Sequence, residues 1–178
     1  MTLDQRIVLA PEDGSLGPLL RIADDRLDPG TGYGRHDHRA VDVVAVVLTG
    51  SLRHRWGDGA HLSVGDVAVL RAGTGLTHDE VAGDEGARVL QCYLRSADPA
   101  AAPYHEVHRV VAGWLDLGRD DARLWVRRVR AGDPVPEGLL VLRGADHVVV
   151  RQQPGGPVDE PGVALVWHLD VGRPAWAD

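Results

Sequence analysis

The chain has 178 residues, 44% hydrophobic and 25% charged, which is usual for one ordinary globular domain or two small ones. Its formal charge of −7 argues against direct binding to nucleic acid, and its single cysteine, Cys92, excludes an internal disulfide and a cysteine-based zinc site. No apolar segment approaches the ~20 residues of a membrane span, and the N-terminus lacks the apolar region of a signal peptide, so we expect a cytoplasmic protein.

Short strand candidates separated by glycine-containing turns fill the first half of the chain. The β-branched segment 39–48 and the segment 52–56 predict two strands, with a turn at Thr49-Gly50-Ser51 between them. Further strands are expected at 61–64, 67–70, 76–81 and 88–94.

The second half repeats this pattern more weakly after an Ala- and Pro-rich connector at 96–103. The segment 104–115 fits either a short helix or a loop. Strands are expected at 124–129, 139–143, 148–152 and 163–169. Regular short strands with turn signals predict an all-β fold, a sandwich or a barrel, with one domain at residues 1–98 and a shorter one at 99–178.

Two short motifs carry the chemistry of this sequence. Residues i and i+2 of a strand share one face, so His36 and His38 point the same way, and so do His78 and Glu80. The two hairpins expected between these pairs can return both of them to one end of a barrel. We therefore predict a metal site with three imidazoles and one carboxylate.

This donor set is of borderline hardness and suits Fe(II), Mn(II), Ni(II), Cu(II) or Zn(II) better than Ca(II), which prefers six to eight oxygens. Four protein ligands leave one or two positions open on a five- or six-coordinate ion. An open position can accept O2 or a chelating substrate, whereas tetrahedral zinc would close the site and be structural. The alternative is a set of histidines that bind no metal.

Two further residues near the motifs have open roles. Asp42 shares strand parity with His36 and His38 if no bulge intervenes, so it is a candidate extra ligand or an acceptor for the N–H of a ligating imidazole, or else an acidic residue on the rim. Tyr33 either lines the mouth of the pocket or packs in the core. His54 and His61 have no partner two residues away, and we expect both on the surface.

The residues of the two motifs resemble those of a known family. The segment GTGYGRHDHRAVDVVAVVLTG, residues 30–50, resembles the first cupin motif, and GDVAVLRAGTGLTHDE, residues 65–80, resembles the second. The AGTG sequence before His-x-Glu is similar to that of the pirin family, whose members typically read G-F-G-x-H-x-H and then G-x-G-x-x-H-x-E. The likeness covers residues 20–95.

This resemblance implies a bicupin fold, with two stacked β-barrels and the metal only in the N-terminal one. It implies Fe(II) held by His36, His38, His78 and Glu80. The chain is shorter than typical pirins, so the resemblance implies an abbreviated second barrel without a metal site. Asp37, Asp42 and Tyr33 stand where pirins usually have Pro, Glu and Phe.

Three functions follow as hypotheses. The first is an iron-dependent dioxygenase of the quercetin 2,3-dioxygenase type, acting with O2 on a flavonol-like aromatic, with Glu80 as the proton-transferring residue. The second is an iron- and redox-sensing regulator that binds a protein partner, in keeping with the roles implied for eukaryotic pirins. The third is a metal site kept for stability. Self-association is compatible with each of them.

Overall fold

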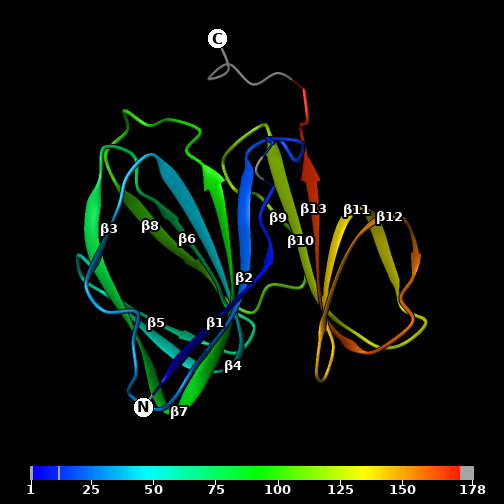
Figure 1. The fold of residues 1–178 in the computed structure, drawn as a ribbon, viewed down its shortest axis with the longest axis horizontal. Helices are drawn as coiled ribbons and strands as arrows, with labels where there is room; N and C mark the ends of the chain where they lie inside the picture. Colours follow the sequence, from blue (N-terminus) through cyan, green and yellow to red (C-terminus); the bar gives the residue numbers. More distant parts are fainter. Residues whose placement is uncertain (1, 12, 173–178) are drawn as a thin grey trace. The chain divides into compact units, whose positions relative to one another are not determined.

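The structure is a computed structural model that describes residues 2–11 and 13–172 (Figure 1). This part of the chain is built from strands and loops, as the all-β prediction expected, and contains no helix long and apolar enough to cross a membrane. The strands are β1 (Leu3–Leu9), β2 (Leu19–Leu27), β3 (His36–His38), β4 (Val41–Arg55), β5 (Ala60–Ser63), β6 (Val67–Arg71), β7 (Leu76–Arg95), β8 (Tyr104–His108), β9 (Gly113–Leu115), β10 (Ala122–Val129), β11 (Pro134–Arg143), β12 (Val148–Pro157) and β13 (Gly162–Leu169).

Two strands are far longer than the sequence pattern predicted. β4 has 15 residues and β7 has 20, because each continues through a segment that was predicted to be a turn or loop. The predicted turn at residues 49–51 is wrong: the strand bulges there and Gly50 adopts a φ of 66°. A Cβ atom on Gly50 would lie 2.0 Å from the carbonyl oxygen of Gly86 on β7, so this close crossing of two backbones requires glycine.

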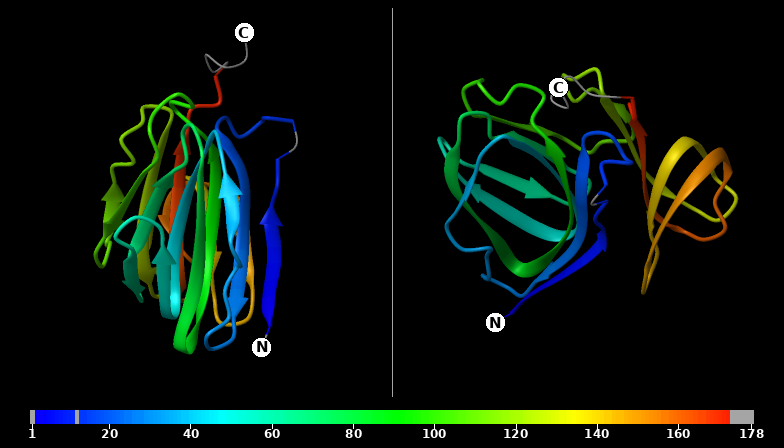
Figure 2. Two further views of the ribbon diagram at one scale, coloured as in Figure 1. Left: turned by 90° about the vertical axis from the view of Figure 1, so that its left-hand side faces the viewer. Right: turned by 45° about the horizontal axis from the view of Figure 1, so that its top comes forward.

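The first sheet has eight strands, and its order is β1-β2-β7-β4-β6-β8, with β3 added to β7 and β5 added to β4. The bend in β4 and β7 lets one half of each strand pair with β3 or β5 and the other half pair with β2 or β6. The strands therefore curve around a common interior, as the right-hand view of Figure 2 shows. The predicted barrel-like architecture is present as an open, curled sheet, because β1 and β8 end the hydrogen-bonded path without pairing with each other.

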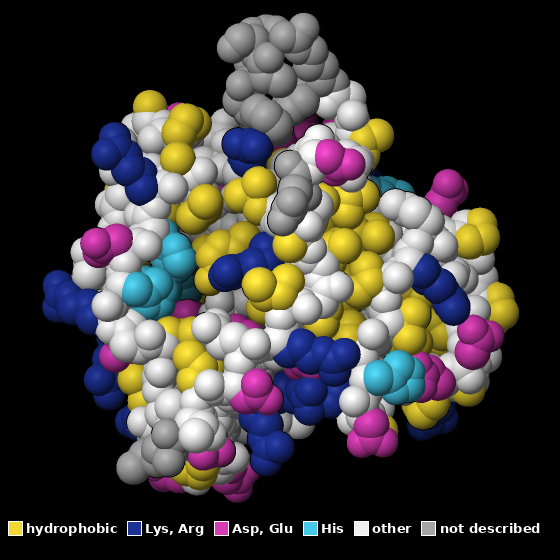
Figure 3. All heavy atoms as spheres, in the orientation of Figure 1, with side chains coloured by type: hydrophobic (Ala, Val, Ile, Leu, Met, Phe, Trp, Pro, Cys, Tyr) yellow, Lys and Arg dark blue, Asp and Glu magenta, His cyan; other side chains and the backbone are white. Residues whose placement is uncertain are grey.

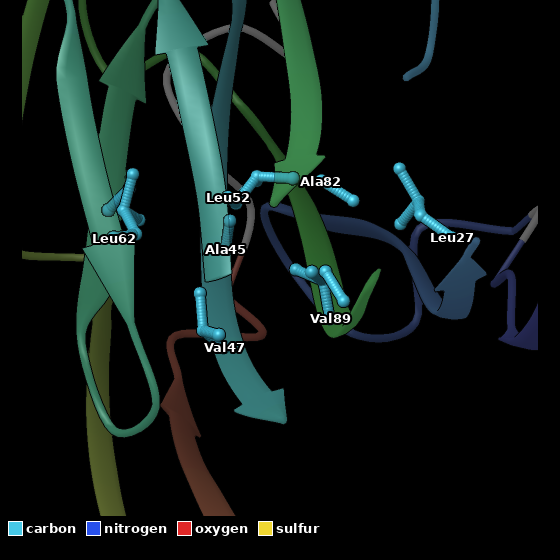
Figure 4. Packing of buried hydrophobic residues seen from close by; sticks show 9 residues of the cluster. Leu27, Ala45, Val47, Leu52, Leu62, Ala82 and Val89 are labelled. Atoms are coloured by element: carbon cyan, nitrogen blue, oxygen red, sulfur yellow. The ribbon is translucent and has the colours of Figure 1, made fainter. Parts of the chain in front are cut away.

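The interior of this sheet is filled by small and branched apolar side chains. Leu27, Ala45, Val47 and Leu52 belong to one cluster and come from β2 and β4, and residues of β5, β6 and β7 complete it (Figure 4). A second cluster, which includes Val43, Leu70 and Leu76, lies at the other end of β4. These clusters hold the strands that carry the histidine motifs in a fixed register.

The second unit contains a five-stranded antiparallel sheet of order β12-β11-β13-β10-β9. Its core is formed by side chains such as Trp125, Leu140 and Val166. The abbreviated second barrel expected here is likewise an open sheet. β11 and β12 extend past the strands expected there, and Gly155 and Gly156 lie within β12 rather than in a separating turn.

The division into units differs from the boundary expected between residues 98 and 99. One compact unit comprises residues 1–10 and 20–110, and the other comprises residues 11–19 and 111–178. The first unit extends beyond the expected boundary because β8 pairs with β6, from Tyr104 opposite Arg71 to His108 opposite Val67. The segment that fitted either a helix or a loop thus contains a strand.

Candidate metal centre

The strand register places the two histidine motifs on one face of the first sheet. His36 of β3 lies directly opposite His78 of β7, and directly opposed residues of antiparallel strands share a face. His38 follows His36 by two residues, as Glu80 follows His78, so alternation brings all four side chains to that face. His54 of β4 lies opposite Glu80 and joins them.

Three imidazoles converge on a single point. The Nε2 atom of His36 lies 3.0 Å from the Nε2 of His38 and 3.0 Å from the Nε2 of His78, and the three ligand atoms all lie within 4.8 Å of one another. Two nitrogens each about 2.1 Å from one ion and about 90° apart are separated by about 3.0 Å, so the spacing fits a shared transition metal. Among residues 2–11 and 13–172, this is the one group of three or more potential ligands.

The hydrogen bonds around the imidazoles leave their Nε2 lone pairs for a cation. The Nδ1–H of His36 donates to the carbonyl oxygen of Gly34 at 2.7 Å, which leaves the Nε2 of His36 unprotonated. The Nδ1 of His78 lies 2.5 Å from the Nε2 of His54. The Nε2 lone pair of His36 lies 3.0 Å from those of His38 and His78. Lone pairs that face one another at this distance repel, and a bound cation relieves that repulsion.

Burial keeps two of these imidazoles neutral. It lowers the pKa of His38 to about 4, with smaller contributions from the neighbouring imidazole of His36 and the guanidinium of Arg21. It lowers the pKa of His78 to about 3, with help from His54 and the other nearby imidazoles. A metal does not have to displace a proton from either ring at neutral pH.

Glu80 is buried on the same face as the three imidazoles, outside the group whose ligand atoms lie within 4.8 Å of one another. Its side chain is 6% exposed, and its Oε2 accepts a hydrogen bond of 3.1 Å from the Nε2 of Gln91. The hydroxyl of Tyr93 donates in turn to the Oε1 of Gln91 at 2.9 Å. Burial raises the pKa of Glu80 to about 7. The structure thus brings together three of the four predicted ligands and leaves the carboxylate outside the 4.8 Å group.

Tyr33 and Asp42 lie in different surroundings. The ring of Tyr33 is 6.3 Å from that of His36, and its hydroxyl donates at 2.9 Å to the Oδ2 of Asp25, a buried carboxyl whose pKa is raised by burial. Asp42 pairs with Leu94, whereas its neighbour Val43 pairs with Tyr93 beside the site. Ala40, with a φ of 54°, breaks the alternation between β3 and β4, so the parity assumed for Asp42 does not hold.

The sequence pattern missed His54. It was expected on the surface, but it is 3% exposed and contacts His78 directly. Its ring also stacks on that of His105 of β8, with centroids 4.1 Å apart. His61, expected on the surface as well, is exposed. Only the pairing of β4 with β7 distinguishes these two histidines, and neither motif carries that information.

The contact between His54 and His78 supports a prediction about metal affinity. Because the metal-binding tautomer of His78 carries its proton on Nδ1, the Nε2 of His54 must act as the acceptor. Replacing His54 by leucine is expected to weaken Ni(II) binding by about 10–100-fold. His54→Gln retains an acceptor oxygen and is expected to stay within a few-fold of the wild type, as is the exposed control His61→Leu. Chelator competition measures all three. Equal losses in the leucine and glutamine variants would contradict the role of acceptor.

Comparison with known proteins agrees with this architecture. Residues 10–94 match the Pirin family model. "Putative quercetin 2,3-dioxygenase Rv0181c" of Mycobacterium tuberculosis is 36% identical over 175 residues, which cover 90% of this chain and 65% of that protein. The quercetin 2,3-dioxygenase of Escherichia coli is 27% identical over 92 residues, covering 49% of this chain and 40% of that protein. The chain therefore spans less than two thirds of these relatives.

Solved structures show the same fold at low sequence identity. YhhW from Escherichia coli aligns with a TM-score of 0.72 at 19% identity, covering 94% of this chain and 90% of that one. A structure of bacterial pirin YhhW in complex with nickel(II) aligns with a TM-score of 0.64, also at 19% identity, covering 94% and 87%. The open sheets and the three-histidine group thus define a cupin-like protein with a candidate metal site. Within that class, the chain is similar to the pirin family, whose model matches residues 10–94.

Proposed function

We propose that this chain is an iron-dependent dioxygenase of the quercetin 2,3-dioxygenase type, which acts on a flavonol-like aromatic with O2. The observation that carries the proposal is the convergence of three Nε2 atoms beside a pocket of about 410 Å³ to which His38 contributes. The names of the Escherichia coli and Mycobacterium tuberculosis relatives support the reaction class. The pocket favours an enzyme over a redox-sensing regulator, because a sensor needs no space for a small molecule beside its ligands.

Four residues of the chain would have separate roles in such a reaction, namely binding the metal and transferring a proton. His36, His38 and His78 would hold the metal through Nε2, and Glu80 would be the fourth ligand, on the same face of β7 as His78. When bound, ferrous iron supplies a position where O2 and an ionised substrate oxygen can meet. The carboxylate of Glu80 would accept the proton of an enol and return it, while the Nε2 of Gln91 donates a hydrogen bond to its Oε2.

The same donor set accommodates other divalent ions. Imidazole nitrogen suits Mn(II), Ni(II), Cu(II) and Zn(II) as well as Fe(II), and affinity alone favours the later metals of the series. The nickel-containing structure of YhhW supports this range. We assign iron on the O2 chemistry, and elemental analysis of protein purified without added metal tests that assignment.

A turnover assay tests the proposed activity. Protein reconstituted anaerobically with one equivalent of Fe(II) is mixed with quercetin, and O2 is then admitted. We expect loss of the flavonol absorbance together with stoichiometric O2 uptake, both abolished in the His36→Ala variant. If fully loaded protein binds quercetin but consumes neither flavonol nor O2, the dioxygenase proposal is wrong.

A further inference from the structure

The pocket beside His38 has a composition unusual for this acidic protein. It lies in the first unit and is lined by apolar side chains, one phenol and two guanidinium groups: Leu20, Val41, Tyr93, Arg21 and Arg39. Figure 3 shows histidine side chains at the surface on this side of the molecule, with hydrophobic and arginine side chains close to them. A ligand that approaches His38 through this pocket meets positive charge in a chain with net charge −7.

Arg21 is held in a fixed place within this pocket. Its Cζ lies 4.1 Å from the centroid of the Tyr93 ring, a cation–π distance, and the hydroxyl of Tyr93 is held by Gln91. The ring of Tyr93 is also 5.8 Å from that of His38, so Arg21 and a candidate ligand of the metal both lie against one phenol. A ligand with a single aromatic ring can therefore reach both groups.

Arg21 differs from the paired arginines of the same unit. Arg88 contacts the buried Asp24 at 2.6 Å, and Arg109 contacts the buried Asp66 at 2.7 Å. Within residues 2–11 and 13–172, no carboxylate forms an ion pair with Arg21, and its buried Nε has no hydrogen-bond partner. Arg21 makes a side-chain hydrogen bond with Tyr93, and a guanidinium that lines a pocket without a carboxylate paired to it is suited to an incoming carboxylate, whose two oxygens match its planar fork.

The other charged groups of the pocket do not cancel this site. Asp37 also lines the pocket, but its Oδ1 accepts a hydrogen bond from the hydroxyl of Thr77. Arg39 is exposed and adds a second positive charge to the same pocket. Asp25, which does not line the pocket, also attracts Arg21, but burial raises the pKa of this carboxyl. Among the lining residues two guanidinium groups outnumber one carboxylate, and Leu20 and Val41 form an apolar wall for a ring.

We propose that this pocket selects small aromatic acids: the carboxylate pairs with Arg21, the ring packs against Leu20 and Val41, and vicinal ring oxygens face His38. The proposal rests on the proposed function, because it takes the histidine group as the metal centre. It narrows the substrate class from flavonol-like aromatics in general to those that carry an anionic group on the side away from the metal.

Two catechols that differ in one carboxylate test this selection. Wild-type protein loaded with one equivalent of Ni(II) is titrated with 3,4-dihydroxybenzoate and with 4-methylcatechol, and Kd values are obtained by calorimetry, so no turnover is required. We expect tighter binding of the acid. Arg21→Gln should raise the Kd of 3,4-dihydroxybenzoate by about tenfold or more, which corresponds to the loss of one charge-assisted hydrogen bond. The Kd of 4-methylcatechol should change by less than about twofold. Arg26→Gln removes the same charge from an exposed position of β2 and should change neither.

The possible outcomes separate this proposal from the proposed function. Equal affinity of both catechols for the wild type, or an equal loss of both in Arg21→Gln, overturns the carboxylate site. An equal effect of Arg26→Gln reduces it to a general effect of charge and also overturns it. Quercetin turnover is scored independently, so a chain that oxidises the flavonol without preferring the acid retains the proposed function and loses only this inference.

Discussion

Replacing His78 by alanine is expected to weaken metal binding by at least about 100-fold, more than the loss of any group that acts through a ligand. His78 is 2% exposed, lies opposite His36, and connects the histidine group to His54. Its loss leaves two imidazoles on a short strand and removes the nitrogen that β7 contributes. Competition with a chromophoric chelator, using Ni(II) and Fe(II) in turn, measures the change.

Thermal unfolding provides a second measurement of the same variant. A metal present at 100 times its Kd stabilises the folded state by about 2.7 kcal/mol, which raises the Tm of a protein of this size by roughly 5–10 °C. We expect that increase for the wild type and for the exposed control His61→Ala, and little change for His78→Ala. A His78→Ala protein that still takes up one equivalent of metal with unchanged affinity would show that the centre lies elsewhere.

The fold was predictable as far as local patterns reach. Alternating apolar residues and glycine-rich turns identified the strands on both sides of residues 49–51 and of residues 82–87. They could not show that each pair of strands is one continuous strand, because glycine signals a turn and a bulge equally well. The distinction depends on Gly50 and Gly86 crossing at close range, and the two are far apart in the sequence.

The site was predictable where it depends on alternation within one strand. His36 with His38, and His78 with Glu80, needed only the two-residue period and the assumption that the two pairs meet. His54 depended on the register between β4 and β7, which local sequence does not specify. Asp42 followed the period across Ala40, where a positive φ ends the regular alternation.

The role proposed for Arg21 could not be predicted from the sequence, for a different reason. Arg21 lies on β2, and its strand was not among those predicted. Nothing in the sequence relates it to Tyr93, which lies on another strand and contributes the ring on which the guanidinium rests. Ligand selectivity depends on contacts of this kind between distant segments, and for that reason the sequence indicated a metal before it indicated a substrate.

The contribution of Glu80 to the stability of the metal-free protein is expected to fall as the pH rises from about 4.5 to about 7. Burial raises the pKa of this carboxyl to about 7, whereas the unfolded chain has the ordinary value of 4.5. Below both pKa values the carboxyl is protonated in the folded and in the unfolded state, and Glu80 takes nothing from the free energy of unfolding. Between them the carboxyl of the unfolded chain releases its proton first, so the contribution of Glu80 to the free energy of unfolding decreases with pH, and above pH 7 this loss is complete at about 3 kcal/mol.

The variant Glu80→Gln isolates this effect, because it keeps the shape and removes the charge. The neutral imidazoles of His38, His54 and His78 have lowered pKa values and reduce stability below pH 6.5, but they do so in both proteins and cancel in the difference. Urea unfolding of metal-free protein should therefore show Glu80→Gln more stable than the wild type at pH 8 and nearly equal to it at pH 4. If Glu80 is the fourth ligand, saturating Ni(II) will reverse the order at pH 8, since the ion stabilises the carboxylate that burial alone destabilises. If Glu80→Gln remains more stable than the wild type at pH 8 with saturating Ni(II), Glu80 is a buried acid beside a three-histidine site and not a ligand.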